Sequence, residues 1–118
     1  MRRAADSAGM GLTPLPAADV ETAFAGLPDW RLDGDALRAE FSFATSAAAV
    51  RFLTAVAADA EDADHHPDVD WRYRLVVVRT TTHCAGGRVT ARDTALAARV
   101  SELAVAAAGG AAVGGAVP

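Results

Sequence analysis

The sequence predicts an α+β fold in which helices cover one face of an antiparallel sheet. Segments of alternating apolar and polar residues, typical of half-buried strands, occur among segments with apolar residues at helical spacing. Their order is helix, hairpin, helix, strand region and helix, which is typical of α+β domains. The length of 118 residues suits one domain. The other face or an edge of the sheet is then available for self-association.

The first expected elements are a short helix and a β-hairpin. Apolar residues at helical spacing predict the helix over residues 17–26, and Gly26 and Pro28 end it. In the hairpin, Asp33 and Gly34 are turn residues between two alternating segments. The alternation predicts a half-buried antiparallel pair with the inward residues Trp30, Leu32, Leu37, Ala39, Phe41 and Phe43.

A second helix is expected after Thr45 or Ser46, either of which can cap it, and it runs to about residue 62. Its apolar residues follow helical spacing: Ala49, Phe52, Leu53, Val56, Ala57 and Ala60. Acidic residues crowd its C-terminal end, where their charges oppose the helix dipole. A functional role is one explanation for these carboxylates, and a solvated acidic turn is the alternative.

The β-branched segment that follows predicts a strand over about residues 71–82, and residues 68–74 are a candidate for a further short strand. Residues 84–88 are expected to form a loop. Thr90 and Asp93 resemble a capping box at the start of a third helix, which runs to about residue 106.

Charge and composition exclude some classes of function. The net charge of −4 argues against a general nucleic-acid-binding protein, which usually carries a basic face. No segment approaches the roughly 18 apolar residues of a membrane span, and no secretory signal region is evident. The single cysteine, Cys84, excludes an intrachain disulfide, so we expect a cytoplasmic protein. Residues 1–12 and 106–118 are expected to be a disordered leader and tail.

The three histidines, His65, His66 and His83, lie at two points of the chain. Two precede Pro67, and the third lies where the strand is expected to end. Histidine gains and loses protons near neutral pH, and strand ends with their loops often carry functional sites. These positions favour an acid–base site, with ordinary polar surface as the alternative.

Two further alternatives involve Cys84. Together with the three histidines it provides four potential zinc ligands, but the spacing resembles no common zinc pattern. Cys84 also lies next to His83, although neighbours in sequence seldom form a nucleophile–base pair. A small residue in a loop is the simpler interpretation of Cys84.

A longer series of residues completes the pattern: Trp30, Phe41-x-Phe43, Phe52, Glu61, Asp64-His65-His66-Pro67, Tyr73, Thr82-His83, Gly86-Gly87 and Asp93. This series resembles the pterin-4a-carbinolamine dehydratases, also called 4a-hydroxytetrahydrobiopterin dehydratases, over about residues 13–105. The resemblance implies an α+β domain with a four-stranded antiparallel sheet and three helices, assembled as a homodimer or homotetramer.

The resemblance also implies an activity. Such an enzyme removes water from a 4a-hydroxytetrahydropterin to give the quinonoid dihydropterin, which recycles the pterin of aromatic amino acid hydroxylases. It implies a pterin substrate, no metal, no organic cofactor, and a hydroxylase as a further partner. Relatives that serve as assembly partners imply an alternative, a non-catalytic dimerisation or assembly protein on the same fold.

Roles of single residues follow from the same resemblance. His65 and His83 would be the acid–base pair, without deciding which is the acid, and His66 would bind or polarise the pterin. Glu61 and Asp64 would orient histidines or meet the amide-like edge of the pterin. Asp93 would support the site, with a helix cap as its alternative role. The sequence departs from the family pattern at three positions, Cys84, Arg88 and Val69.

Overall fold

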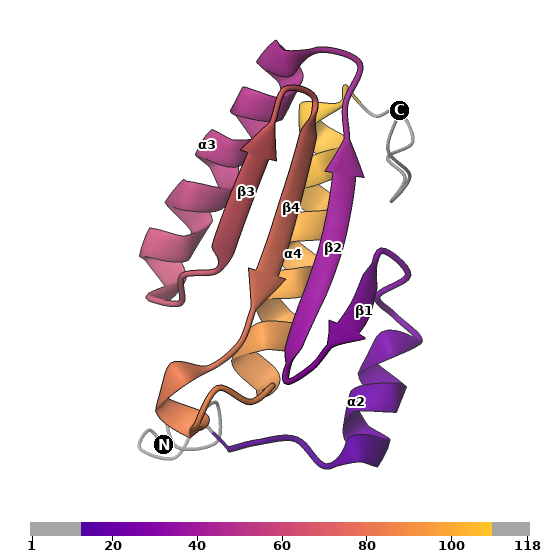
Figure 1. Ribbon diagram of the computed structural model, residues 1–118, viewed down its shortest axis with the longest axis vertical. Coiled ribbons are helices and arrows are strands. Elements are labelled where there is room, and N and C mark those ends of the chain that lie inside the picture. Colours follow the sequence, from indigo (N-terminus) through magenta and orange to yellow (C-terminus); the bar gives the residue numbers. More distant parts are fainter. Residues whose placement is uncertain (1–12, 110–118) are drawn as a thin grey trace.

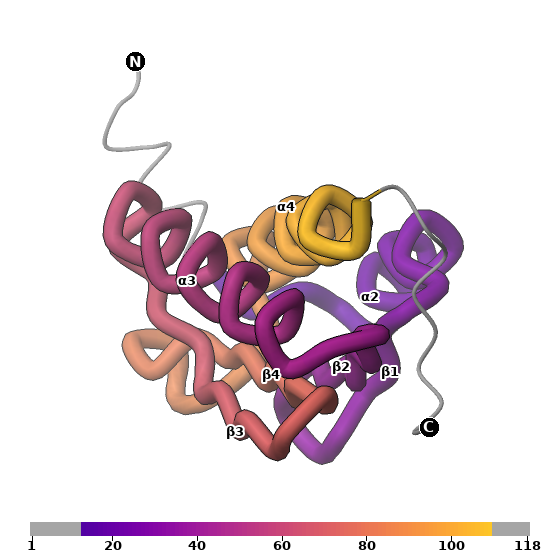
Figure 2. The backbone as a smooth tube through the Cα atoms, turned by 90° about the horizontal axis from the view of Figure 1, so that it is seen from above, coloured from indigo at the N-terminus to yellow at the C-terminus, as the bar shows by residue number. Residues whose placement is uncertain are grey.

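In the computed structural model, which describes residues 13–109, four antiparallel strands form one sheet in the order β1-β2-β4-β3. Helices α2, α3 and α4 all cover the same face of this sheet (Figures 1 and 2). The α+β prediction is therefore confirmed. The leader expected over residues 1–12 and the last part of the expected tail, residues 110–118, lie outside the described residues.

Helix α2 spans Ala17–Phe24 and ends earlier than predicted, because the chain already turns at Ala25 and Gly26. The predicted hairpin is confirmed as strands β1 (Trp30–Asp33) and β2 (Ala36–Ser42). The expected inward position of Leu32 is wrong, because Trp30 is the buried residue of β1 and Leu32 is 49% exposed. Gly34 has a φ of 62° in the turn between them, a conformation that glycine adopts without steric cost.

Helix α3 spans Ser46–Ala63, and Thr45 caps it by accepting a hydrogen bond from the backbone N–H of Ala48. The fully buried Phe52 anchors this helix to the sheet. Its ring centroid lies 5.1 Å from that of Phe41 and 5.2 Å from that of Phe43. The alternating residues of β2 and the apolar stripe of α3 thus meet in one aromatic cluster.

The prediction of a single strand over residues 71–82 is wrong. The segment divides into β3 (Asp68–Arg72), where the alternative short strand was expected, and β4 (Leu75–Thr80). The chain reverses at Tyr73 and Arg74, and Tyr73 adopts a φ of 56°. Left-handed conformations are uncommon for bulky residues. Because the turn contains neither glycine nor asparagine, the sequence gives no sign that the chain reverses here.

After β4, the expected loop contains one turn of 3₁₀ helix, η1 (His83–Ala85), and helix α4 then spans Ala91–Ala107. The predicted capping box of Thr90 and Asp93 is confirmed. Arg99 Nε lies 2.8 and 3.0 Å from the two carboxylate oxygens of Asp59, and this ion pair joins α4 to α3. Residues 106 and 107, expected in the tail, belong to this helix.

Replacement of Phe52 by alanine should lower the free energy of unfolding by about 3–5 kcal/mol, because it opens a cavity in the aromatic cluster. Urea denaturation measures the change. Thr54→Ala on the exposed side of the same helix is the control, with an expected loss below about 1 kcal/mol. Equal losses for the two variants would contradict this description of the core.

Candidate active site

The C-terminal end of α3 determines where His65 lies. Asp64 adopts the left-handed conformation, with φ 52° and ψ 43°. The backbone N–H groups of Asp64 and His65 donate back to the carbonyl oxygens of Glu61 and Ala60, at 3.3 and 3.1 Å. This pattern is a Schellman-type helix end, and aspartate is one of the few residues other than glycine that tolerate its left-handed position. The chain therefore turns sharply, and His65 is buried directly after an exposed helix end.

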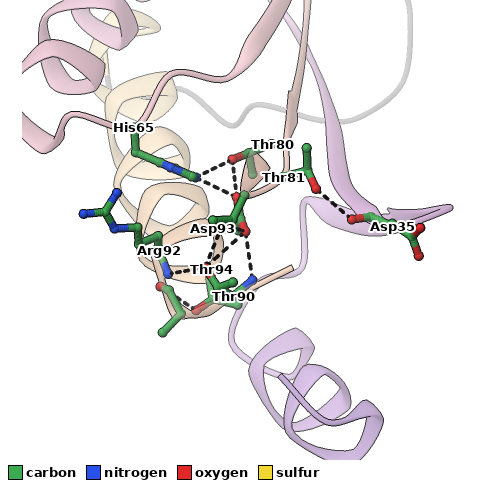
Figure 3. Close-up of polar contacts among 10 residues, drawn as sticks. Asp35, His65, Thr80, Thr81, Thr90, Arg92, Asp93 and Thr94 are labelled. Atoms are coloured by element: carbon green, nitrogen blue, oxygen red, sulfur yellow. Dashed lines mark hydrogen bonds and ion pairs between the residues drawn. The ribbon is translucent and has the colours of Figure 1, made fainter. Parts of the chain in front are cut away.

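His65 contacts residues from two other elements (Figure 3). Its Nε2 lies 2.7 Å from Oδ1 of Asp93 in the first turn of α4 and 3.2 Å from Oγ1 of Thr80 at the end of β4. The side chain of His65 is 8% exposed and that of Asp93 is 0% exposed. The imidazole is thus held from behind by a carboxylate that solvent does not reach.

Besides the contact with His65, three hydrogen bonds shorter than 3 Å surround the Asp93 carboxylate. The hydroxyl of Thr80 donates to Oδ1 at 2.6 Å, and the hydroxyl of Thr82 donates to Oδ2 at 2.6 Å. The backbone N–H of Thr90 donates to Oδ2 at 2.8 Å. A buried carboxylate is costly unless it is hydrogen-bonded, and contacts from β4 and from the residues just before η1 and α4 meet that requirement here. Asp93 is therefore both a helix cap and the partner of His65.

The three histidines meet at one cavity of about 380 Å³ at this end of the sheet. His65 and His66 reach it from the segment before β3, and the exposed His83 reaches it from η1. The volume is within the usual range of small-molecule sites. The half-buried Arg92 also lines the cavity, and the sequence analysis did not single it out.

His66 and Glu61 form an exposed pair, with 3.0 Å between His66 Nε2 and Glu61 Oε1. His66 lines the histidine cavity and also a second, mainly apolar cavity of about 220 Å³ between α3 and β3. Glu61 lines the second cavity and is not among the residues that line the histidine cavity. Since both side chains are exposed, the pair adds little to stability.

The remaining residues singled out from the sequence are divided between the site and other places. Asp64 and Cys84 line the histidine cavity. Val69 lines the apolar cavity, and Arg88 lines a different cavity beside α2. Tyr73 is 70% exposed in the β3–β4 turn, at the opposite end of the sheet from η1 (Figure 1).

Among residues 13–109, no three or more His, Cys, Asp or Glu side chains are grouped so that they could hold a metal ion. The residues of the zinc alternative share a cavity, but they form no such group. None of the helices in this range is long and apolar enough to cross a membrane.

Sequence reasoning assigned no role to the hydroxyl groups of Thr80 and Thr82. It counted both as β-branched strand residues, and Thr82 also as part of the family pattern. A signal was present, because residues two apart in an extended segment share one face. On this face, the Thr82 hydroxyl contacts both Thr90 and Asp93, the two residues of the predicted capping box.

The sequence family described as Pterin 4 alpha carbinolamine dehydratase matches residues 13–103 of the chain. A candidate pterin-4-alpha-carbinolamine dehydratase of Chloroflexus aurantiacus is 44% identical over 89 residues, which cover 75% of this chain and 95% of the relative. A protein of the same description from Streptomyces avermitilis is 38% identical over 95 residues, which cover 80% of this chain and 94% of the relative.

Two solved structures are also similar. A transcriptional coactivator/pterin dehydratase from Brucella melitensis has a TM-score of 0.74 and 30% identity, covering 78% of this chain and 99% of that one. A pterin dehydratase-like protein identified as a RuBisCO assembly factor in the alpha-carboxysome has a TM-score of 0.56 and 30% identity, covering 64% of this chain and 89% of that one. The match over most of the chain and the extent of these similarities show that the protein belongs to the pterin 4 alpha carbinolamine dehydratase family.

Proposed function

We propose that this protein is a hydro-lyase that dehydrates 4a-hydroxytetrahydropterin, such as 4a-hydroxytetrahydrobiopterin, to the quinonoid dihydropterin. The observation that carries the proposal is the convergence of His65, His66 and His83 on one cavity of about 380 Å³. Membership of the family supports the same reaction class.

The proposed reaction needs only proton transfers. The bond between C4a and the hydroxyl oxygen breaks, and the oxygen leaves as water after it gains a proton. N5 loses its proton, and the C4a–N5 double bond forms. Nothing is oxidised or reduced overall, and the proposal assigns both proton transfers to histidines, with no metal and no organic cofactor. Histidines suit both proton transfers, and such assistance is worth roughly 10²–10⁴-fold in rate.

In the proposed site, His65 and His83 exchange protons with the pterin, one as acid and the other as base. His66, paired with Glu61, binds the pterin at the rim, and Asp64 contributes a carboxylate to the same cavity. Asp93 has no exposed surface, so we assign it to positioning His65 rather than to contact with the pterin.

The variants His65→Ala and His83→Ala should each lower the rate of dehydration roughly 10²–10⁴-fold, because each removes one proton-transfer group. Stopped-flow spectroscopy of quinonoid dihydropterin formation from synthetic 4a-hydroxytetrahydropterin measures the rate. Thr54→Val, which changes an exposed hydroxyl on α3, is the control and should keep the wild-type rate. Full activity in both histidine variants would contradict the assignment of the site.

His66→Ala and Glu61→Gln should raise KM more than they lower kcat, because the pair is proposed to bind the pterin rather than to transfer its protons. Steady-state kinetics over a range of pterin concentrations separates the two parameters. A loss confined to kcat would place His66 in the chemical step instead.

The second candidate function is a non-catalytic role in protein assembly. It is favoured by the solved structure that is described as a RuBisCO assembly factor. Such a role does not depend on the histidines, so partner binding that survives His65→Ala would support it. A folded wild-type protein that does not accelerate dehydration would turn the assignment towards this candidate.

The proposal also includes self-association as a homodimer or homotetramer. Val50 on α3 and Val105 on α4 are 38% and 47% exposed, which suits helices that pack against a second copy. Light scattering after size-exclusion chromatography should give two or four times the mass of one chain. A single-chain mass at all concentrations tested would exclude self-association.

The proposed setting is the cytoplasm, with an aromatic amino acid hydroxylase as the partner whose pterin is recycled.

A further inference from the structure

We propose that Thr80 is a positioning residue that, with Asp93, keeps the ring proton of His65 on Nε2 and leaves Nδ1 as the atom that exchanges protons. The geometric part of this inference stands on the hydrogen bonds around His65 alone. Its consequence for the rate rests on the proposed dehydratase function.

The Thr80 hydroxyl carries a single proton. Its oxygen lies 2.6 Å from Oδ1 of Asp93 and 3.2 Å from Nε2 of His65. An ionised carboxylate only accepts hydrogen bonds, so the shorter contact uses the hydroxyl proton. Thr80 therefore presents a lone pair, not a proton, to His65.

Nε2 of His65 lies near two oxygen atoms. Its two neighbours are Oδ1 of Asp93 at 2.7 Å and the Thr80 oxygen at 3.2 Å, and both act as acceptors. A ring nitrogen between two acceptors carries a hydrogen whether the ring is neutral or charged. In the neutral ring the lone pair is then on Nδ1.

The other hydrogen-bonding groups around Asp93, from Thr82 and Thr90, also donate towards its carboxylate. The Thr82 hydroxyl and the Thr90 backbone N–H both donate to Oδ2 of Asp93. The Thr90 oxygen accepts from the N–H of Arg92. Because the Thr82 hydroxyl donates its single proton to Asp93, the Thr90 hydroxyl is the donor in its 2.7 Å contact with the Thr82 oxygen, and its contact with Oδ2 of Asp93 is longer, at 3.5 Å. Each proton in this chain points towards Asp93, and hydrogen bonds in such a chain strengthen one another.

Thr80 therefore restrains His65 in two ways. It provides one of the two acceptors for the Nε2 hydrogen. If the ring rotated by 180° about its Cβ–Cγ bond, a carbon atom would face both acceptors and these hydrogen bonds would be lost. It also donates a hydrogen bond to Oδ1 of Asp93. Without it, His65 would be the one remaining donor to this buried oxygen in the part of the chain that the structure describes. Of the two hydrogen-bond partners that Nε2 has among the described residues, removing this hydroxyl leaves Asp93 alone.

The wild-type protein provides the first test. Long-range ¹H–¹⁵N NMR of protein labelled with ¹⁵N-histidine, at a pH where the ring is neutral, should show His65 Nε2 as the protonated nitrogen and Nδ1 as the unprotonated one. A dominant Nδ1–H tautomer would overturn the inference. This measurement needs no substrate, so it decides the inference even if the protein does not dehydrate pterins.

Matched variants provide the second test. Thr80→Val keeps the shape but removes the hydroxyl, and it should increase the Nδ1–H fraction of His65 and lower kcat about tenfold with little change in KM. Loss of groups that orient histidines in metal sites costs 10–100-fold, which sets this scale. Thr80→Ser should restore both the spectrum and kcat, whereas Thr54→Val should match the wild type.

The outcomes separate the two proposals. A Thr80→Val spectrum and kcat identical to those of the wild type would overturn the role of Thr80. If Thr80→Val does not fold, the comparison of Thr80→Ser with the wild type decides: loss of the Nε2–H tautomer despite the retained hydroxyl would overturn the inference. Absence of turnover in the wild type would instead overturn the proposed function and leave the NMR result standing.

Discussion

The buried carboxylate of Asp93 is the constraint on which the arrangement of this end of the molecule depends. It begins α4 as a capping residue, and it also contacts the end of β4, the segment leading into η1, and His65. A carboxylate with no exposed surface is tolerated only if its oxygens are hydrogen-bonded, so these contacts must form together. The hydrogen bonds that stabilise the Asp93 carboxylate therefore also determine the place and orientation of the His65 imidazole.

The helix end before His65 complements this constraint. The left-handed Asp64 stops α3 and directs the chain inwards, which separates the buried His65 from the exposed His66 although they are neighbours. One imidazole thus has a fixed, desolvated partner, while the other lies at the rim beside Glu61. His83, carried by η1, completes a cavity whose three imidazoles differ in burial and in the groups they contact.

The local elements were largely predictable because their signals are local. The alternation in the first hairpin, the stripe around Phe52 and the capping pattern of Thr90 and Asp93 each depend on residues close in sequence. The division of the last strand segment was not predictable, because Tyr73 adopts a left-handed turn conformation that the sequence does not advertise. The hydroxyls of Thr80 and Thr82 were missed because the same residue type also favours strands.

By itself, the sequence determined the fold class, the helix boundaries to within a few residues, the core stripes and the candidate histidines, since periodicity and residue type express these directly. Only the tertiary structure decided which groups meet. It paired His65 with Asp93 and Thr80, and Glu61 with His66. It also placed Tyr73 in the turn before β4, whereas η1 with His83 follows the other end of that strand. The physical reason is that a hydrogen bond between residues 28 positions apart depends on how β4 and α4 pack, and no local pattern encodes that packing.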